Sequence, residues 1–336
     1  MASKGYAAPE VEKAYLRARQ LCLELGETKR LFPVLWSLWV FYLVGAKFAK
    51  AREIAEELQG PAERSQDPAV LAQAYHAMGT TLGYQGELAS ARSYFERGIA
   101  VYDPRRHRSA TFLYLLDPAV GCRCLLARAL WLEGRPEEAV EKVQEALTIG
   151  ESLAHPQSLA YALVVGSMTL QLHHQVARAQ RQAEAGSALA REHDLPQVEP
   201  WGTIVLGWTL VEQGRHQEGI AQMQDSLKMQ RAIGSELDRP YCLALLAEAL
   251  AKAGQVEGGL TALAEALEAA QSTGERYYEA ELHRRQGELL LDQGAGRAEA
   301  KACFARALEM ARRQGARSLE LRAAASLARM GDPQVR

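Results

Sequence analysis

The sequence predicts an all-α fold, a right-handed α-solenoid of antiparallel helix pairs that repeats every 40 residues. The first reason is composition, since 48% of the residues are hydrophobic while only 5 Trp, 12 Tyr and 6 Phe are aromatic. Much of the core must then consist of Ala and Leu, which are strong helix formers. The second reason is that short turn segments recur at Gly134, Gly214, Gly254 and Gly294, and His174 stands at the missing midpoint.

Each unit is predicted to contain two amphipathic helices joined by a tight glycine turn. Around Gly254 the apolar residues recur at helical spacing on both sides of the turn. They are Leu243, Leu246, Ala247 and Leu250 before the turn and Leu260, Leu263 and Leu267 after it. Glycine adopts the left-handed backbone that closes the first helix without a Cβ clash. The two helices of a unit are therefore expected to form a hairpin.

Proline motifs predict where the first helix of several pairs begins. Asp67-Pro68 and Asp117-Pro118 place a capping carboxylate before a proline at the first helical position, where the missing N–H does no harm. His155-Pro156, Glu199-Pro200 and Arg239-Pro240 mark the same point with weaker caps. Five helix starts are thus expected at these motifs.

The whole chain, residues 1–336, is expected to form a single superhelical domain. Further turns near Gly45 and Gly86 extend the array, which gives an unpaired N-terminal helix in 1–30, seven helix pairs in 31–316 and an unpaired C-terminal helix in 317–336. In a stacked array each unit buries its apolar face only against its neighbours. The unpaired end helices therefore either cap the array or mark where a longer protein was cut, and we expect the second. The unpaired end helices could also pack against those of a second copy and so form a homodimer.

Charge, cysteine content and hydropathy exclude several classes of partner and location. Lys plus Arg (39) against Asp plus Glu (41) gives a net charge of -2, which argues against a nucleic-acid partner. The five scattered cysteines do not form a disulfide framework, and this favours the cytoplasm. The longest apolar stretch, residues 34–46, is well short of the roughly 20 residues that cross a bilayer, so no membrane is expected.

Several units resemble the tetratricopeptide (TPR) repeat. In that pattern the first helix has a large residue, then an apolar residue followed by Gly, then a second large residue, and the second helix has Ala and an aromatic residue. The best copy is Tyr75-x2-Met78-Gly79-x2-Leu82 followed by Ala91-x3-Phe95. Looser copies begin at Thr203 and at His283. The usual unit has about 34 residues, so a 40-residue unit implies longer helices and a TPR-like array.

The segments between the turns carry a more specific resemblance. They are 102–108, 117–120, 153–162, 239–248 and 277–284. They are similar to the C-terminal repeats of bacterial proteins in which a class III adenylate or guanylate cyclase, a kinase or a LuxR-type regulator precedes a STAND-type, AAA-like predicted ATPase. The resemblance implies a regulatory, partner-binding arm of a larger signalling ATPase or cyclase. The chain itself contains no Gly-x4-Gly-Lys-Ser/Thr phosphate loop.

No catalytic, cofactor or metal site is predicted, and the chain is not expected to be an enzyme. No Gly-x-Ser-x-Gly or His-Glu-x-x-His motif occurs. Cys122 and Cys124 would point to different sides of a helix, so a buried structural role is preferred to zinc binding. A basic cluster, Arg105, Arg106, His107 and Arg108, is either a solvated loop or a site for an acidic partner.

A partner-binding groove is predicted on the concave surface, which in TPR arrays is lined by the first helix of each pair. Positions about 13, 10, 6, 3 and 2 residues before each turn residue define this surface. In this sequence they include His76, Tyr84, Arg128, Trp131, Tyr161, Met168, Trp201, Trp208, Tyr241 and Glu248. Aromatic residues and Arg dominate the binding energy of interfaces, so a protein or peptide, including the parent ATPase or cyclase domains, is the expected occupant.

Three alternatives stay open from the sequence alone. These side chains could pack against neighbouring turns of a tightly coiled superhelix. The groove could instead hold a small ligand such as a sugar, or a signalling peptide, in which case a closed, dry pocket is expected. An all-helical enzyme would need clustered carboxylates, for which Glu212, Glu248 and Glu288 in different units are thin support.

Overall fold

The computed structural model describes residues 9–103, 114–294 and 296–331, which form sixteen helices and no strand. The helices are α1 (Pro9–Glu24), α2 (Thr28–Val44), α3 (Phe48–Ser65), α4 (Pro68–Tyr84), α5 (Leu88–Val101), α7 (Pro118–Leu132), α8 (Pro136–Leu153), α9 (Pro156–Leu172), α10 (Val176–Glu192), α11 (Glu199–Glu212), α12 (His216–Ala232), α13 (Arg239–Lys252), α14 (Val256–Thr273), α15 (Glu279–Asp292), α16 (Arg297–Gln314) and α17 (Arg317–Arg329). The all-α solenoid prediction is confirmed.

Successive helices from α2 to α16 form hairpins whose turns have the predicted left-handed residue. Positive φ angles occur at Gly86, Gly134, Gly214, Gly254 and Gly294, and also at His174 and Ala46. The first turn therefore lies one residue later than predicted, because Gly45 has a φ of −77° and Ala46 takes the left-handed position. Ala46 lies 40 residues before Gly86, so this turn has the regular spacing. The extension of one domain over all of 1–336 stays a prediction.

Helices begin at all five proline motifs, but only three of them have the expected cap. Glu199 and Arg239 are themselves the first residues of α11 and α13, whose N-cap positions make no side-chain capping hydrogen bond. The Asp67 and Asp117 carboxylates accept hydrogen bonds of 2.9 Å from the backbone N–H groups of Ala69 and Ala119. His155 caps α9 through its Nδ1, which lies 3.3 Å from the Ser158 backbone nitrogen.

Glycines inside the helices allow the two helices of a hairpin to approach closely. A Cβ on Gly79 of α4 would lie 2.7 Å from Cε1 of Phe95 on α5, and one on Gly287 of α15 would lie 2.6 Å from Cε1 of Phe304 on α16. Both aromatic rings are buried in the hairpin core. The Gly and the aromatic residue of the TPR pattern are therefore packing partners.

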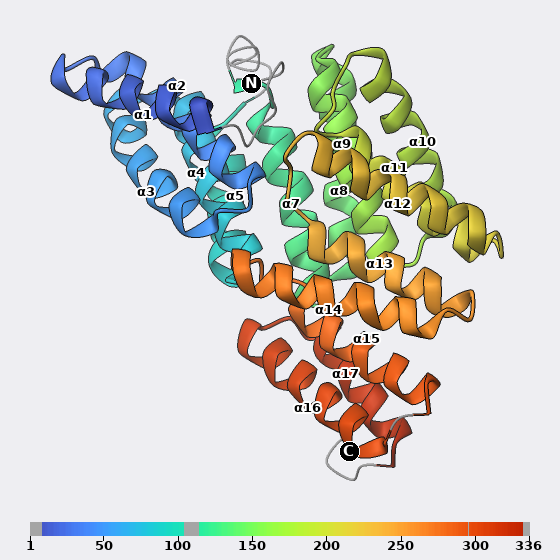
Figure 1. Ribbon diagram of the computed structural model, residues 1–336. Helices are drawn as coiled ribbons and strands as arrows, with labels where there is room; N and C mark the ends of the chain where they lie inside the picture. Colours follow the sequence, from blue (N-terminus) through green and yellow to red (C-terminus); the bar gives the residue numbers. More distant parts are fainter. Residues whose placement is uncertain (1–8, 104–113, 295, 332–336) are drawn as a thin grey trace.

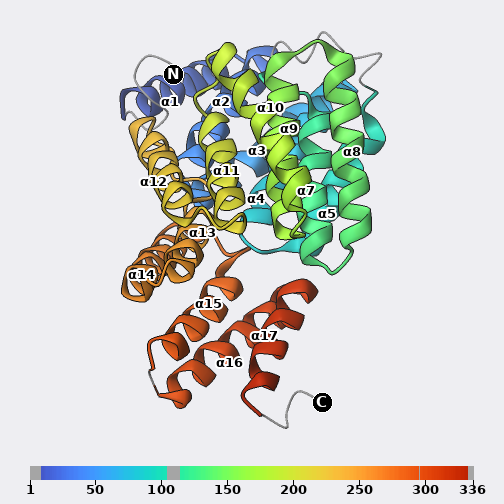
Figure 2. The same cartoon turned by 90° about the vertical axis from the view of Figure 1, so that its right-hand side faces the viewer.

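The hairpins coil into a superhelix in which later units contact earlier ones. In Figure 1 the pair α13 and α14 crosses beneath the earlier helices, and α15, α16 and α17 lie below them, an arrangement that Figure 2 shows from the side. The Glu236 N–H donates to the Val44 carbonyl at 3.0 Å, and the Arg276 N–H donates to the Tyr84 carbonyl at 2.7 Å. The loops before α13 and α15 are thereby attached to the ends of α2 and α4.

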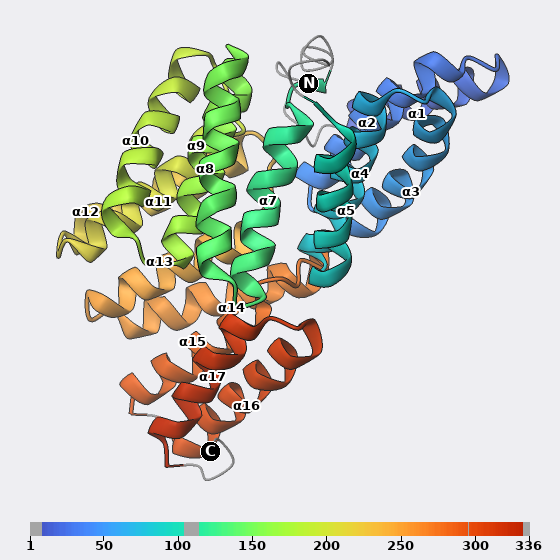
Figure 3. The ribbon, with the colours of Figure 1, turned by 180° about the vertical axis from the view of Figure 1, so that it is seen from behind.

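The last helix contacts the middle of the chain. The Ser318 hydroxyl of α17 donates to the Trp131 carbonyl of α7 at 2.5 Å, and Arg322 donates to the Leu172 carbonyl of α9 at 2.9 Å. Figure 3 shows α17 below α7 from behind. Among the described residues, no helix has the length and apolar character needed to span a bilayer.

Candidate functional site on the inner face

The ten predicted groove residues all lie on the first helices of hairpins, and most of them are buried. They belong to α4, α7, α9, α11 and α13. Trp201 is 5% exposed and Trp208 is 1% exposed, while Tyr161 is half-buried. Side chains from units that are not neighbours in the array therefore fill the middle of the inner face. Partner binding by these residues stays a prediction.

A central cluster joins four units of the array through one carboxylate. Asp238 accepts hydrogen bonds from the hydroxyls of Tyr84 at 2.6 Å and Tyr277 at 2.7 Å, and from Arg128 Nη1 at 3.1 Å. The Arg128 guanidinium lies 4.4 Å from the ring centroids of both tyrosines. These two cation–π contacts and the ion pair satisfy a charge that is almost fully removed from water.

A second buried carboxyl group, that of Glu275, lies beside this cluster. Its Oε2 accepts a hydrogen bond of 3.2 Å from the Asp238 backbone N–H. Burial raises the pKa of Glu275 well above its ordinary value, and the charge of Asp238 raises it further. These surroundings favour the neutral form of Glu275, while Asp238 pairs with Arg128.

An apolar cavity of about 110 Å³ lies on one part of the inner face, between helices of the first units and α11. We call it the apolar cavity. It is lined by Trp36, Trp39, Val40, Leu43, Val44, His76, Thr80, Tyr84, Tyr114, Leu115, Leu116, Gln157, Tyr161, Gln197, Val198, Trp201 and Leu237. None of the described residues that line it is Asp, Glu, Lys or Arg. Burial lowers the pKa of His76 to about 4, so this histidine is neutral at pH 7.

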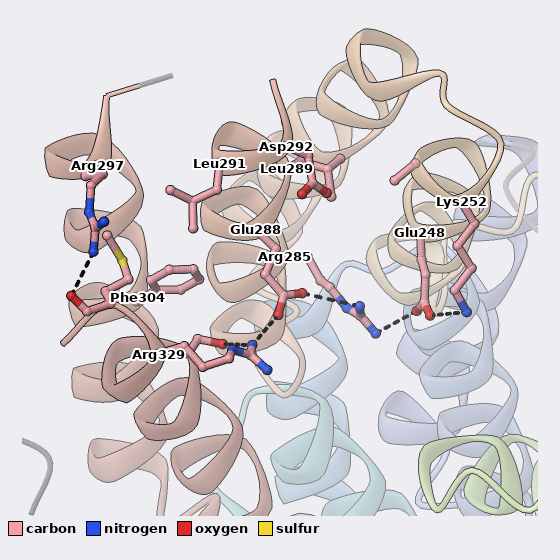
Figure 4. Close-up of a pocket in the computed structure, with 13 residues that line it drawn as sticks. Glu248, Lys252, Arg285, Glu288, Leu289, Leu291, Asp292, Arg297, Phe304 and Arg329 are labelled. Atoms are coloured by element: carbon pink, nitrogen blue, oxygen red, sulfur yellow. Dashed lines mark hydrogen bonds and ion pairs between the residues drawn. The ribbon is translucent and has the colours of Figure 1, made fainter. Parts of the chain in front are cut away.

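The later units form a different surface, rich in charges, which we call the charged groove. It consists of two adjoining hollows of about 610 and 260 Å³ that share Glu248, Arg285, Glu288 and Arg329. Figure 4 shows Arg285 between Glu288 and Glu248, with Lys252 on the far side of Glu248. Trp208 and Tyr278 line the smaller hollow.

The charged groove is held in shape by one deeply buried carboxylate, Glu281. Its two oxygens accept hydrogen bonds from Arg284 at 2.7 and 2.8 Å, and Arg285 and Arg322 lie 3.2 and 3.3 Å away. Burial alone would raise the pKa of Glu281, but these guanidinium groups outweigh it and lower the pKa to about 2. Arg322 also stacks on Trp131, with 4.8 Å from its Cζ to the ring centroid.

The structure divides the predicted site residues between these surfaces. His76, Tyr84, Tyr161 and Trp201 line the apolar cavity, and Trp208 and Glu248 line the charged groove.

The other predicted residues take part in internal packing. Arg128 belongs to the central cluster, and Trp131 lies beneath Arg322. The Tyr241 hydroxyl donates to Gln171 Oε1 at 2.9 Å, and Met168 is buried in α9. The basic cluster Arg105, Arg106, His107 and Arg108 lies outside the described residues.

Two groups of site residues were missed, although the counting rule contains the signal for both. Counting back 13 and 10 residues from Gly294 gives Glu281 and Arg284, which join Glu288, already named from the sequence, in the charged network. Counting back 10 and 6 residues from Ala46 gives Trp36 and Val40, which line the apolar cavity. The glycine at 45 concealed this register, because the turn was expected one residue too early.

The described residues contain no group of three or more His, Cys, Asp or Glu side chains that could hold a metal ion. Cys122 and Cys124 are both buried within α7. Burial raises the pKa of the Cys122 thiol and raises that of Cys124 to about 12. Both thiols therefore stay protonated at pH 7, which fits a packing role.

Comparison with known sequences gives one family match and one long relative. Residues 71–102 match the family model of the tetratricopeptide repeat. An uncharacterized protein of Rhizobium meliloti (strain 1021) is 26% identical over 311 residues, which cover 91% of this chain and 30% of the relative. The chain thus spans about a third of the length of this curated relative.

Comparison with solved structures supports the fold. A Rap protein complexed with Competence and Sporulation Factor aligns with a TM-score of 0.64 and 14% identity, covering 84% of this chain and 76% of its own. NprR in complex with its cognate peptide NprX has a TM-score of 0.58 and 15% identity, with 89% and 85% covered. A STAND protein with a tetratricopeptide repeat sensor from Pyrococcus horikoshii has a TM-score of 0.50 and 14% identity, with 98% and 51% covered. The predicted resemblance to TPR-like helical repeats is therefore confirmed, by the repeat at 71–102 and by the fold.

Proposed function

We propose that this chain is a non-enzymatic protein–protein interaction module that binds a peptide segment in the charged groove. In this proposal it is the regulatory, partner-binding arm of a larger bacterial signalling ATPase or cyclase and works in the cytoplasm. The TPR-like fold and the similarity to part of a longer relative support the proposal. Helical-repeat folds host many functions, so the argument rests on the groove itself.

The observation that carries the proposal is the combination of the size of the charged groove with the exposed charged side chains that line it. Its larger hollow has the volume of sites that hold molecules of several hundred daltons. The side chains of Arg329 and Lys252 are 68% and 37% exposed, so a peptide can reach them. Carboxylates of both Glu248 and Glu288 lie beside them, which favours a segment with charges of both signs.

The compared structures supply a precedent for the kind of occupant. Among proteins of similar fold, NprR is described in complex with its cognate peptide, and the Rap protein with Competence and Sporulation Factor. The STAND protein is described as having a TPR sensor. We extend the peptide-binding role to this chain because its charged groove has aromatic and Arg side chains of the type that anchors peptides.

The proposal is tested by affinity capture with wild-type protein at about 0.1 M and about 1 M salt, followed by mass spectrometry. Synthetic peptides that cover the captured partner are then titrated against the wild type and two variants. Arg329→Glu reverses an exposed charge in the groove, and Arg215→Glu, at the turn before α12, is the matched control because Arg215 also forms an exposed pair with a Glu. We expect Arg329→Glu to weaken peptide binding at least tenfold. Unchanged affinity in this variant, or equal loss in the control, would reject the groove.

Contact between copies through the end helices is a further part of the proposal. Leu16, Leu23 and Leu25 of the α1 region and Leu321 of α17 are exposed, at 41%, 53%, 73% and 69%. Exposed leucines in the end units of a repeat array are suited to cover another apolar surface. Light scattering should show a dimer that is lost when Leu16 and Leu23 are changed to Lys. A monomer at all concentrations would contradict this contact.

A further inference from the structure

Four unpartnered polar atoms belong to residues that line the apolar cavity. They are Trp36 Nε1, His76 Nδ1, His76 Nε2 and Gln197 Oε1. None of them has a hydrogen-bond partner among the described residues, and all four are shielded from solvent. Trp36 and His76 are 5% and 4% exposed, so the side chains cannot turn out to solvent without unpacking. Four of the ten such atoms in the described part of the chain thus belong to residues of one cavity.

This clustering has an energetic consequence. A buried polar group without a partner destabilises the folded state, and native proteins leave few such groups. The cost is removed if a molecule inside the cavity supplies the missing acceptor and donors. Trp36 offers an N–H donor and Gln197 a carbonyl acceptor. Nε2 of His76 lies against Gly121 of α7, so Nδ1 is the ring nitrogen left for an occupant of the cavity.

The walls restrict the chemistry of that molecule. Because none of the described lining residues is charged, an ion would lose its hydration without gaining a counterion from them. The rings of Trp36, Trp39, Tyr114 and Trp201 favour a flat apolar body. A sugar or an extended peptide has more hydrogen-bonding groups than these few partners can satisfy.

The size of the cavity sets an upper limit on the occupant. A cavity of about 150 Å³ holds benzene, so about 110 Å³ accommodates a single small ring with slight movement of the walls. The half-buried Val40 and Tyr161 border this space and can shift more easily than fully buried residues.

We propose that the apolar cavity binds an uncharged small molecule with one aromatic ring and a polar group that both donates and accepts hydrogen bonds. The site is separate from the charged groove, with which it shares no lining residue. It therefore goes beyond the proposed peptide binding, and either site can be present without the other. Tyr84 lines this cavity and also bonds to Asp238, so an occupant would contact the central cluster.

The test uses two matched pairs of probes on the wild-type chain. Benzamide and benzoate have the same shape but differ in charge, and phenol and toluene differ by one hydroxyl group. Binding is followed by saturation-transfer NMR and by the fluorescence of the tryptophans, three of which line the cavity. Benzamide is expected to bind at least tenfold more tightly than benzoate, and phenol at least threefold more tightly than toluene.

Two variants connect any binding to this cavity. Trp36→Phe keeps an aromatic wall but removes the N–H donor, and Val40→Trp fills the space. Trp131→Phe is the control, because Trp131 lies outside the cavity beneath Arg322. Trp36→Phe should lower the affinity for benzamide at least threefold, and Val40→Trp should abolish benzamide binding. Trp131→Phe should leave the affinity unchanged. If Val40→Trp fails to fold, as judged by circular dichroism, Trp36→Phe still decides the question.

Several results would overturn the proposal. These are no binding of either neutral polar probe, equal binding of benzamide and benzoate, or binding that both variants leave unchanged. A crystal structure soaked with benzamide provides a direct view of the cavity. Ordered water alone on Trp36, His76 and Gln197 would show that solvent, and no ligand, satisfies these groups.

Discussion

The Arg128 guanidinium lies 3.1 Å from the Asp238 carboxylate, although 110 residues separate them along the chain. One residue belongs to α7 and the other precedes α13, so the bond joins units that are not neighbours in the array. The rings of Tyr84 and Tyr277 both lie against the guanidinium and contact each other edge to face, with centroids 5.6 Å apart. The curvature of the superhelix is therefore fixed by specific contacts across its axis as well as by stacking.

Loss of this pair should destabilise the fold strongly. Arg128→Met leaves the buried Asp238 charge without its cation, and breaking a buried pair typically costs about 3–5 kcal/mol. The measurement is the free energy of unfolding in urea. Arg135→Met is the control, because Arg135 and Glu138 form an exposed pair that should contribute little to stability. Similar losses in the two variants would mean that the central cluster adds little.

Adjacent glycines in α14 should respond to alanine with opposite signs. A Cβ on Gly259 would lie 2.6 Å from Leu289 Cδ2 and 3.0 Å from the Ala247 carbonyl oxygen, whereas one on Gly258 would meet only Leu250, at 3.6 Å. Gly259→Ala should therefore lower stability by about 1–3 kcal/mol through overpacking. Gly258→Ala should raise it by up to about 1 kcal/mol, because alanine favours the helix. Thermal and urea unfolding of both variants measure the difference, and equal effects would contradict the close approach of α13, α14 and α15.

His76 should make the protein less stable in mild acid. Burial lowers its pKa to about 4 from an ordinary value of 6.5. Between these values the unfolded chain binds a proton that the folded chain does not, so stability falls as the pH decreases from 6.5 to 4. Over this whole pH range the free energy of unfolding should fall by about 3 kcal/mol. Urea unfolding across this range should show a shallower pH dependence for His76→Phe than for wild type, and parallel curves would refute the neutral, buried state.

Cysteine reactivity should separate buried from accessible thiols. Cys122, Cys124 and Cys242 are buried, and burial raises the pKa of each thiol. The native protein should therefore react with an aromatic disulfide reagent at Cys22 and Cys303, and all five cysteines should react in urea. Peptide mass mapping identifies the labelled sites. Rapid native labelling of Cys122 or Cys124 would show that α7 is less well packed than the structure indicates.

The repeat period predicted most of the fold because each turn depends on a local backbone requirement. A left-handed residue is needed at the end of each first helix, and glycine at 134, 214, 254 and 294 reveals it directly. At the first turn Ala46 takes that conformation, so the visible Gly45 gave the wrong register by one residue.

The inner face was harder to predict because its exposure depends on the curvature of the whole array. Trp201 and Trp208 lie on the expected surface of α11, but they are buried there. Small differences in packing between successive units accumulate into a tight coil, and a periodic pattern contains no measure of that accumulation. The partners Arg128 and Asp238 could not be paired from the sequence, since neither local spacing nor charge singles them out.

The bond from Ser318 to the Trp131 carbonyl also changes how this molecule should come apart. In an ordinary solenoid the terminal unit can fray alone, since it contacts only its neighbour. Here, release of α17 would simultaneously uncover Trp131 and free the ends of α7 and α9. Truncation from the C-terminal side should therefore weaken the middle of the molecule, and melting should be one concerted event instead of a stepwise unzipping.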